Sequence, residues 1–270
     1  MRSLFGDAIA DAGAEIERVA GFALAPEETA PFAEFIGWLN LRPRFIADWR
    51  CDPERELRFY GRFTQGLDAC RQGYVAAAYH LGRLREIESA VQAILDRYDF
   101  STLPRGSTAA FGNTARWDFE YQAFVLAYRR SLDGLAWGLS TYFKSEISSF
   151  RQFAKVLPKL HPRAVAAALG GACDRHIDSF AFVMGSARGQ SVRDRISHRE
   201  AVQAGVINVG AFGHRIVGGG EGLGLGGMHD RRGLGETLQT RLRALHDAVA
   251  DILTTFRAAV NSHEGDASVD

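Results

Sequence analysis

Two long stretches of this 270-residue chain carry apolar residues at helical spacing, and they constrain the fold more than any other feature. The first follows Pro53 and comprises Leu57, Tyr60, Phe63, Leu67, Cys70, Tyr74, Ala77, Leu81, Leu84, Ile87, Val91, Ile94 and Leu95. The second comprises Trp117, Tyr121, Phe124, Tyr128, Leu132, Leu135, Leu139 and Phe143. Steps of three and four residues place such side chains on one buried face of a helix. The sequence therefore predicts a long antiparallel helix pair as the spine of a helical bundle.

Four glycines interrupt the first stretch, at positions 61, 66, 73 and 82. Glycine inside a helix is less stable than alanine, so each position needs a reason. Either these glycines bend the helix or they permit close packing against a neighbour. The spacing alone leaves both explanations open.

Shorter helices are predicted on both sides of this pair. Ile9, Ile16, Val19 and Phe22 form one stripe before Pro26, a second stripe precedes Pro43, and both are expected to pad the core. Helical segments are also expected over 145–157, from Pro162 to about 185, over 192–204 with Ser191 as the cap, and over 236–260.

The stretch between these last two helices has a different character. Residues 206–209 and 214–217 are short β-type runs, and glycines at 210 and 213 suit a turn between them. Residues 100–113 are expected to form a loop, as are the glycine-rich residues 218–235. The predicted fold class is all-α, an antiparallel helical bundle with a small β-hairpin and a glycine-rich loop near residues 206–235.

The chain is expected to form one main domain. We predict an N-terminal helical extension over 1–52 packed on the core, a helical bundle over 53–262, and a disordered tail over 263–270. No uncharged apolar run is long enough to span a bilayer, and early acidic residues do not fit a signal peptide. Cys51, Cys70 and Cys173 are an odd, scattered set, which predicts reduced thiols. We therefore expect a soluble cytoplasmic protein without a membrane partner.

Charge is balanced over the chain, with 32 Lys and Arg against 32 Asp and Glu. No global positive field recruits a polyanion, so such a site needs a local basic patch. The densest patch comprises Arg188, Arg193, Arg195, His198 and Arg199. Only Asp194 opposes it within that span.

Helical spacing gives this patch a specific geometry. Asp194 and His198 are i,i+4 neighbours on a helix, so Asp194 is placed to orient or charge the imidazole. Arg193 and His198 are five residues apart, which is roughly 140° around an ideal helix. Their convergence therefore requires either that Arg193 lies in the first helical turn or that a second subunit contributes.

The pattern Arg193–polar–x–x–x–His198 on a late helix resembles the signature of the HEPN superfamily. The span from about 115 to 204 is similar in arrangement to such domains, and residues 120–125 and 130–136 resemble their preceding long helix. The resemblance implies a metal-independent endoribonuclease without a cofactor. It also implies a homodimer in which two motifs meet at a shared cleft.

Carried over, Arg193 and His198 take the two motif positions and Asp194 the polar position, which implies that these three are catalytic. Arg188, Arg195 and Arg199 are predicted to bind RNA. The 2′-hydroxyl of RNA is the nucleophile, an imidazole moves protons and a guanidinium stabilises charge on the phosphoryl oxygens. The expected products are a 2′,3′-cyclic phosphate and a 5′-hydroxyl.

The resemblance also suggests a biological setting, namely defence or stress, with an antitoxin or regulatory protein as a partner. One branch of the family carries a tyrosine two residues after the histidine, where this chain has Glu200. That difference argues against a partner that modifies a tyrosine there.

Two other functions fit parts of the sequence. A helical bundle of this kind also serves as a non-catalytic dimerisation or binding module. A nucleotide-binding regulator is suggested by residues 222–227, which match G-x-G-x-x-G. No βαβ unit surrounds that pattern and polar residues follow it, so an exposed loop flanking a cleft is the preferred interpretation.

Overall fold

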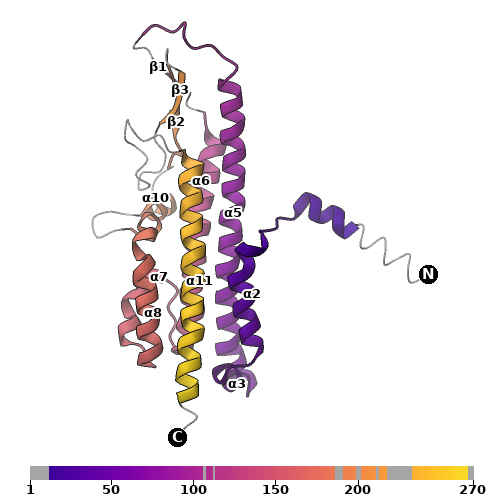
Figure 1. Ribbon diagram of the computed structural model, residues 1–270, viewed down its shortest axis with the longest axis vertical. Coiled ribbons are helices and arrows are strands. Elements are labelled where there is room, and N and C mark those ends of the chain that lie inside the picture. The colour runs from indigo at the N-terminus through magenta and orange to yellow at the C-terminus, as the bar shows by residue number, and fades with distance from the viewer. Residues whose placement is uncertain are drawn as a thin grey trace, which may run out of the picture.

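The computed structural model describes residues 12–105, 108–111, 113–185, 191–198, 202–210, 213–217 and 233–266. This part of the chain is mostly helical, which confirms the predicted fold class at that level. Long helices run side by side along the longest axis, and three short strands lie at one end (Figure 1). Helix α3 and the C-terminal end of α11 lie at the other end (Figure 1).

The helices and strands follow one another along the chain in this order. They are α2 (Pro26–Asn40), α3 (Arg44–Trp49), α4 (Pro53–Arg55), the π-helix η1 (Glu56–Gly61), α5 (Arg62–Leu95), β1 (Thr108–Phe111), α6 (Ala115–Tyr142), α7 (Phe150–Val156), the 3-10 helix η2 (Leu157–Lys159), α8 (Arg163–His176), the 3-10 helix η3 (Ile177–Phe180), α9 (Ala181–Met184), α10 (Val192–His198), β2 (Val206–Gly210), β3 (Gly213–Val217) and α11 (Leu234–Asp266). Residues 12–20 are also helical.

Helices α5 and α6 approach each other closely because glycines remove the side chains from their interface. A Cβ atom at Gly66 would lie 2.3 Å from the backbone nitrogen of Gly138, and one at Gly73 would lie 2.5 Å from that of Ser131. From Gly134 the corresponding distance to the nitrogen of Cys70 is 2.5 Å. The contacting residue numbers rise along α5 as they fall along α6, so the two helices are antiparallel. Close packing, rather than bending, therefore explains Gly66 and Gly73.

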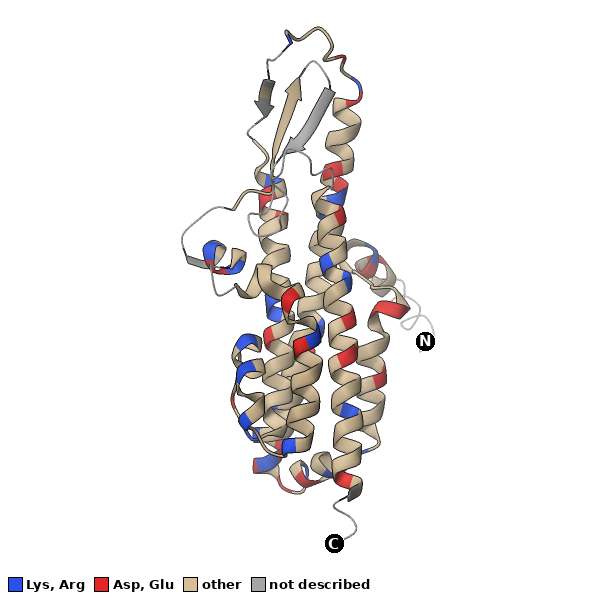
Figure 2. Cartoon of the chain, turned by 60° about the vertical axis from the view of Figure 1, so that its left-hand side comes forward, with Lys and Arg blue, Asp and Glu red and all other residues tan. Residues whose placement is uncertain are grey.

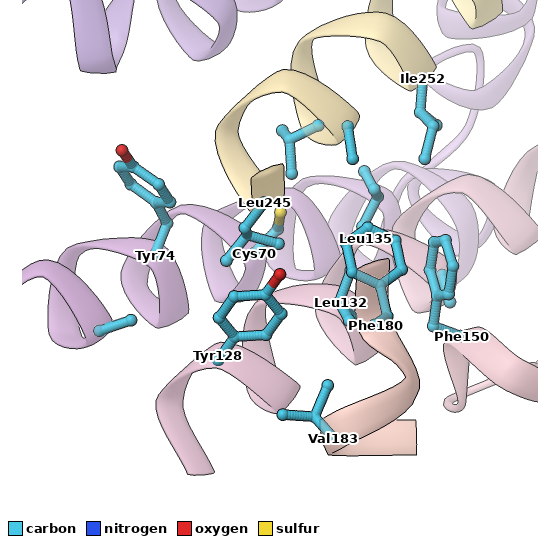
Figure 3. Packing of buried hydrophobic residues seen from close by; sticks show 14 of the residues in the cluster. Cys70, Tyr74, Tyr128, Leu132, Leu135, Phe150, Phe180, Val183, Leu245 and Ile252 are labelled. Atoms are coloured by element: carbon cyan, nitrogen blue, oxygen red, sulfur yellow. The ribbon is translucent and has the colours of Figure 1, made fainter. Parts of the chain in front are cut away.

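One hydrophobic core joins this pair to the other helices. Side chains of α5, α6, η3, α9 and α11 meet in it, as Figure 3 shows for Cys70, Tyr128, Phe180, Val183 and Leu245. The hydroxyl of Tyr128 stays satisfied there, since it donates to the carbonyl oxygen of Arg241 at 3.1 Å. The predicted stripe of α6 is buried throughout, and so is most of the predicted stripe of α5, but Leu57 and Ile94 near the two ends of that first stripe are 80% and 46% exposed.

The N-terminal region divides into two parts. Aromatic side chains of α2 and α3 are buried in the same core as the long helices, among them Phe35, Trp38 and Trp49. Residues 12–20 instead project from the bundle (Figure 1), with Ile16 64% and Val19 77% exposed. The expectation that this first stripe pads the core is wrong for that segment, because no other described element covers it.

Three strands form an antiparallel sheet in the order β1–β2–β3. Strand β2 pairs with β3 with Ile207 opposite Ile216, and with β1 with Val209 opposite Ala109. Residues 100–113 were expected to be a loop, so β1 corrects that prediction. A four-residue strand with no strong β signal forms there because β2 supplies its hydrogen-bonding partner.

Several helix ends also differ from the prediction. Residues 145–149 are not helical, and Ser140 Oγ accepts a hydrogen bond from the Ile147 N–H at 3.2 Å, which ties this stretch back to the end of α6. Helix α11 continues to Asp266, so residues 263–266 are helical rather than part of a disordered tail. There the Glu264 carboxylate accepts the backbone N–H groups of Arg44 and Phe45. None of the helices in the described ranges is both long and apolar enough to cross a membrane.

Candidate functional site

Helix α10 carries the motif, and Ser191 sets where it begins. The buried Ser191 hydroxyl accepts a hydrogen bond from the Asp194 N–H at 3.0 Å, which caps the helix as predicted. Arg193 is consequently the second residue of α10 and lies in its first turn. This is one of the two arrangements that convergence with His198 requires.

The helix is shorter than expected. It is described from Val192 to His198, residues 199–201 lie outside the described residues, and residues 202–204 are not helical, so the predicted helix over 192–204 is wrong at its C-terminal end. The reason is tertiary. The Ala204 N–H donates to the Asp118 carboxylate at 2.6 Å, and the Gln122 side-chain amide donates to the carbonyl oxygen of Val202 at 3.1 Å.

Arg193 and Asp194 form an ion pair at the surface. Arg193 Nη1 donates to Asp194 Oδ1 at 3.0 Å, and the two side chains are 37% and 42% exposed. Burial raises the pKa of the Asp194 carboxyl, but hydrogen bonds from Ser191 and Arg193, with the charges of Arg193 and Arg129, bring it below its ordinary value. Asp194 is therefore ionised at neutral pH and orients the Arg193 guanidinium.

Arg129 on α6 lies near Asp194 and forms a hydrogen-bond network of its own. The sequence does not predict this residue as part of the site. Its guanidinium donates to Asp133 Oδ2 at 2.8 Å, to Ser149 Oγ at 3.0 Å and to the Val183 carbonyl oxygen at 3.3 Å. Asp133 in turn accepts the Phe150 N–H at 2.9 Å. The network ties α6 to the end of α9 and the start of α7. The only sequence signal for it is a charged residue directly after the buried Tyr128.

Among the described residues, two buried aromatic side chains of α6 have unpaired polar atoms, and one of them, Tyr121, lies near α10. Tyr121 and Trp117 of α6 are buried, and within the described residues neither Tyr121 OH nor Trp117 Nε1 has a hydrogen-bond partner. Burial raises the pKa of Tyr121, while the positive charge of Arg195 acts in the opposite direction. Arg195 thus lies close enough to the phenol to act on it, which places a second arginine of the basic patch against α6.

The anchoring of residues 202–204 gives a testable expectation. Replacing Asp118 with alanine removes the acceptor of the Ala204 N–H, which is buried and then has no partner. The loss is about 1–2 kcal/mol for that amide, or roughly a tenfold faster hydrogen exchange. Exchange measured by mass spectrometry or NMR checks it, with Asp96→Ala on the exposed end of α5 as the control. Unchanged exchange at Ala204 contradicts the anchoring role.

Other parts of the predicted site lie outside the described residues. These are Arg188, Arg199, Glu200 and the glycine-rich residues 218–232. The backbone of His198 is described as the last residue of α10, and its side chain is not. Of the six predicted site residues, the structure therefore pairs Arg193 with Asp194 and places Arg195 near Tyr121.

His176, Cys70 and Cys173 have structural surroundings. His176 Nε2 lies 2.9 Å from Asp251 Oδ2, and Arg175 binds the same carboxylate at 2.8 Å. Cys70 and Cys173 are buried free thiols, and burial raises the pKa of each to about 12. Within the described ranges, no three His, Cys, Asp or Glu side chains gather as metal ligands.

Comparison with known proteins adds no family to these observations. No protein-family model matches the chain, and neither the curated proteins nor the solved structures include one that matches it.

Proposed function

We propose that the chain is a metal-independent endoribonuclease of the HEPN type, with Arg193 and His198 as catalytic residues and Asp194 as the residue that orients Arg193. The observation that carries this proposal is the position of Arg193. It lies in the first turn of the helix that ends at His198, and its side chain is partly exposed. A long arginine side chain at a helix start can swing toward the face that a residue five positions later occupies.

The surroundings of Arg193 suit contact with a phosphodiester. Its described ion pair uses one of the five guanidinium N–H groups, and the others can donate to phosphoryl oxygens. Arg195 and Arg129 add positive charge around the same helix. In Figure 2 basic and acidic positions alternate on this short helix, which stands out from the bundle. RNA is the substrate class that this basic patch fits best.

The proposed reaction needs only groups of the protein and the RNA. The 2′-oxygen forms a bond to phosphorus and the bond to the 5′-oxygen breaks, which gives a 2′,3′-cyclic phosphate and a 5′-hydroxyl. His198 moves the proton of the 2′-hydroxyl or supplies one to the leaving oxygen. Arg193 stabilises the charge that builds on the phosphoryl oxygens.

The proposal includes a homodimer in which the α10 helices of two copies face one cleft, and an antitoxin or regulatory protein that binds the dimer. Arg188 and Arg199 extend the proposed RNA contact. Sedimentation of the full chain tests the dimer independently of cleavage.

Cleavage of a mixed RNA in the presence of EDTA tests the function. Wild type is expected to generate 2′,3′-cyclic phosphate ends. Arg193→Ala and His198→Ala are each expected to lower the rate roughly 100-fold or more, as loss of a charge stabiliser or a general acid–base does. End-group analysis of the products measures both the rate and the chemistry.

The matched control is Arg130→Ala, because Arg130 is an exposed arginine of α6 without a hydrogen bond or ion pair to the described residues. It should cleave like wild type. Thermal unfolding confirms that each variant is folded. If folded wild type cleaves no RNA, or if all variants cleave equally, the protein is instead the non-catalytic dimerisation or binding module.

A further inference from the structure

The end of the bundle away from the strands contains a hollow of about 860 Å³. Its walls come from α3, η1, the C-terminal end of α6, the turn before α8 and the last turns of α11. In Figure 1 this is the lower end, where α3 lies, whereas α10 lies nearer to the strands. Because the hollow and α10 lie at different heights of the bundle, the hollow is separate from the proposed ribonuclease site. Its volume is within the range of roughly 300–1,000 Å³ that small-molecule sites occupy.

Aromatic rings form one wall of the hollow. Phe45 and Trp49 of α3 are buried, and Phe59 and Tyr142 beside them are partly exposed. Trp49 stacks on Phe59 with centroids 5.8 Å apart, and Phe45 meets Tyr142 edge-on at 5.1 Å. Phe45 and Trp49 are covered by neighbouring rings, and the Arg58 guanidinium lies over the Phe59 ring, so the apolar surface left for a planar ligand is the partly exposed part of Phe59 and Tyr142. Burial, followed by the charge of Glu264, raises the pKa of Tyr142 to about 12, so its hydroxyl stays a donor at neutral pH.

Cations stand at the rim of the same hollow. The side chains of Arg44 and Lys144 are exposed, and they form no hydrogen bond or ion pair with other residues that the structure describes. The Glu264 carboxylate is already bound by the Arg44 and Phe45 N–H groups at 2.8 and 3.0 Å. Asp48 is the other acidic residue of the lining. The side chains left to meet a ligand charge are therefore mostly basic, which favours an anion.

Lys144 occupies a backbone conformation that favours glycine. It directly follows the C-cap of α6 with a φ of 54°, and its N–H donates to the Thr141 carbonyl oxygen at 2.9 Å. Helices commonly end on glycine at this position because it has no Cβ. A lysine there lowers stability relative to glycine and at the same time places a cation at the hollow. Strained residues of this kind concentrate at ligand sites.

We propose that this hollow binds a nucleoside monophosphate, with its base on the aromatic wall and its phosphate at Arg44 and Lys144. A planar ring and a compact anion on one molecule match the two halves of the lining. The volume accommodates a ligand of that size. The proposal does not depend on the ribonuclease activity, and it does not involve the glycine-rich residues 222–227.

Calorimetric titration of the full chain with AMP, adenosine and inorganic phosphate tests the proposal. AMP is expected to bind with a dissociation constant in the micromolar range. Adenosine and phosphate are each expected to bind roughly tenfold or more weakly, because each retains only half of the contacts. Absence of AMP binding at millimolar concentration overturns the proposal. Equal binding of adenosine and AMP also overturns it, since the phosphate is then not recognised.

Variants locate the binding. Lys144→Gly is expected to unfold at the same or a higher temperature than wild type, since it relieves the left-handed backbone, while AMP affinity falls roughly tenfold. Arg44→Ala should lower AMP affinity to a similar degree. Lys155→Ala, at an exposed lysine of α7 outside the lining, should leave it unchanged. If Lys144→Gly and Arg44→Ala both bind AMP like wild type, the hollow is not the site.

Discussion

Gly66→Ala is expected to destabilise the protein by about 2–4 kcal/mol. The added Cβ would lie 2.3 Å from the Gly138 nitrogen and 2.5 Å from its Cα, and these are backbone atoms that no side-chain rotation can move. Helices α5 and α6 would have to separate, which weakens the packing on both sides of their interface. Gly134→Ala should act in the same way, because its Cβ would meet the Cys70 nitrogen at 2.5 Å. Urea unfolding followed by circular dichroism measures the change.

The same substitution at Gly82 should have the opposite sign. Gly82 lies on the exposed side of α5, and a Cβ there would have no atom within 4 Å. Alanine is the better helix former, so Gly82→Ala is expected to stabilise by about 0.5–1 kcal/mol.

Gly138→Ala provides an intermediate step if Gly66→Ala does not fold. Its nearest contacts would be 3.2 Å, to the Leu67 nitrogen and the Phe63 carbonyl oxygen, so a smaller loss is expected. Stability should therefore decrease from Gly82→Ala through Gly138→Ala to Gly66→Ala. Equal effects at all three positions would show that helix propensity, not close approach, governs them.

Arg129→Met should be the second large effect, with a loss of about 2–3 kcal/mol in the free energy of unfolding. The side chain is only 13% exposed, and its removal takes the guanidinium donor away from Asp133 Oδ2 and from the Val183 carbonyl oxygen, while Asp133 Oδ1 keeps the Phe150 N–H. Because Asp133 is 26% exposed, water compensates part of the loss, and the figure stays below that of a fully buried pair. The loss should also raise the pKa of Asp194 toward its ordinary value, since Arg129 is one of the charges that lower it.

The adjacent Arg130 is the matched control. It is exposed on the same helix, so Arg130→Met should change stability by less than about 0.5 kcal/mol. In the double variant with Asp133→Asn, the combined loss should be smaller than the sum of the two single losses, because one interaction is removed twice. Additive losses would show that the two side chains act independently.

Local signals predicted the start of α10 but not its end. Ser191 caps the helix through the N–H of Asp194, three residues later, and that pattern is visible in the sequence. The non-helical form of residues 202–204 depends on Asp118 and Gln122, which lie on α6 and bind the backbone of that segment. No spacing within 192–204 carries that information, so the predicted helix was too long.

The candidate site shows the same division. The sequence predicts a local basic patch that includes Arg193 and Arg195 and is opposed by Asp194, and the structure pairs Arg193 with Asp194 at 3.0 Å. Arg129 was missed because it lies within a strongly apolar helix, where periodicity describes only the buried face. The sequence does not predict the hollow beside α3, because its wall combines residues from 44–59 with the end of α6 and the last turns of α11.

The sequence by itself determined which segments are long helices and which of their faces are buried, because both follow from the period of the apolar residues. It also determined that Arg193 follows a helix cap. Tertiary structure alone decided that Gly66 and Gly73 permit close packing, that β1 joins the sheet and that Lys144 stands beside the aromatic wall. Each of these depends on contacts between residues far apart in the chain, and local propensity does not encode such contacts.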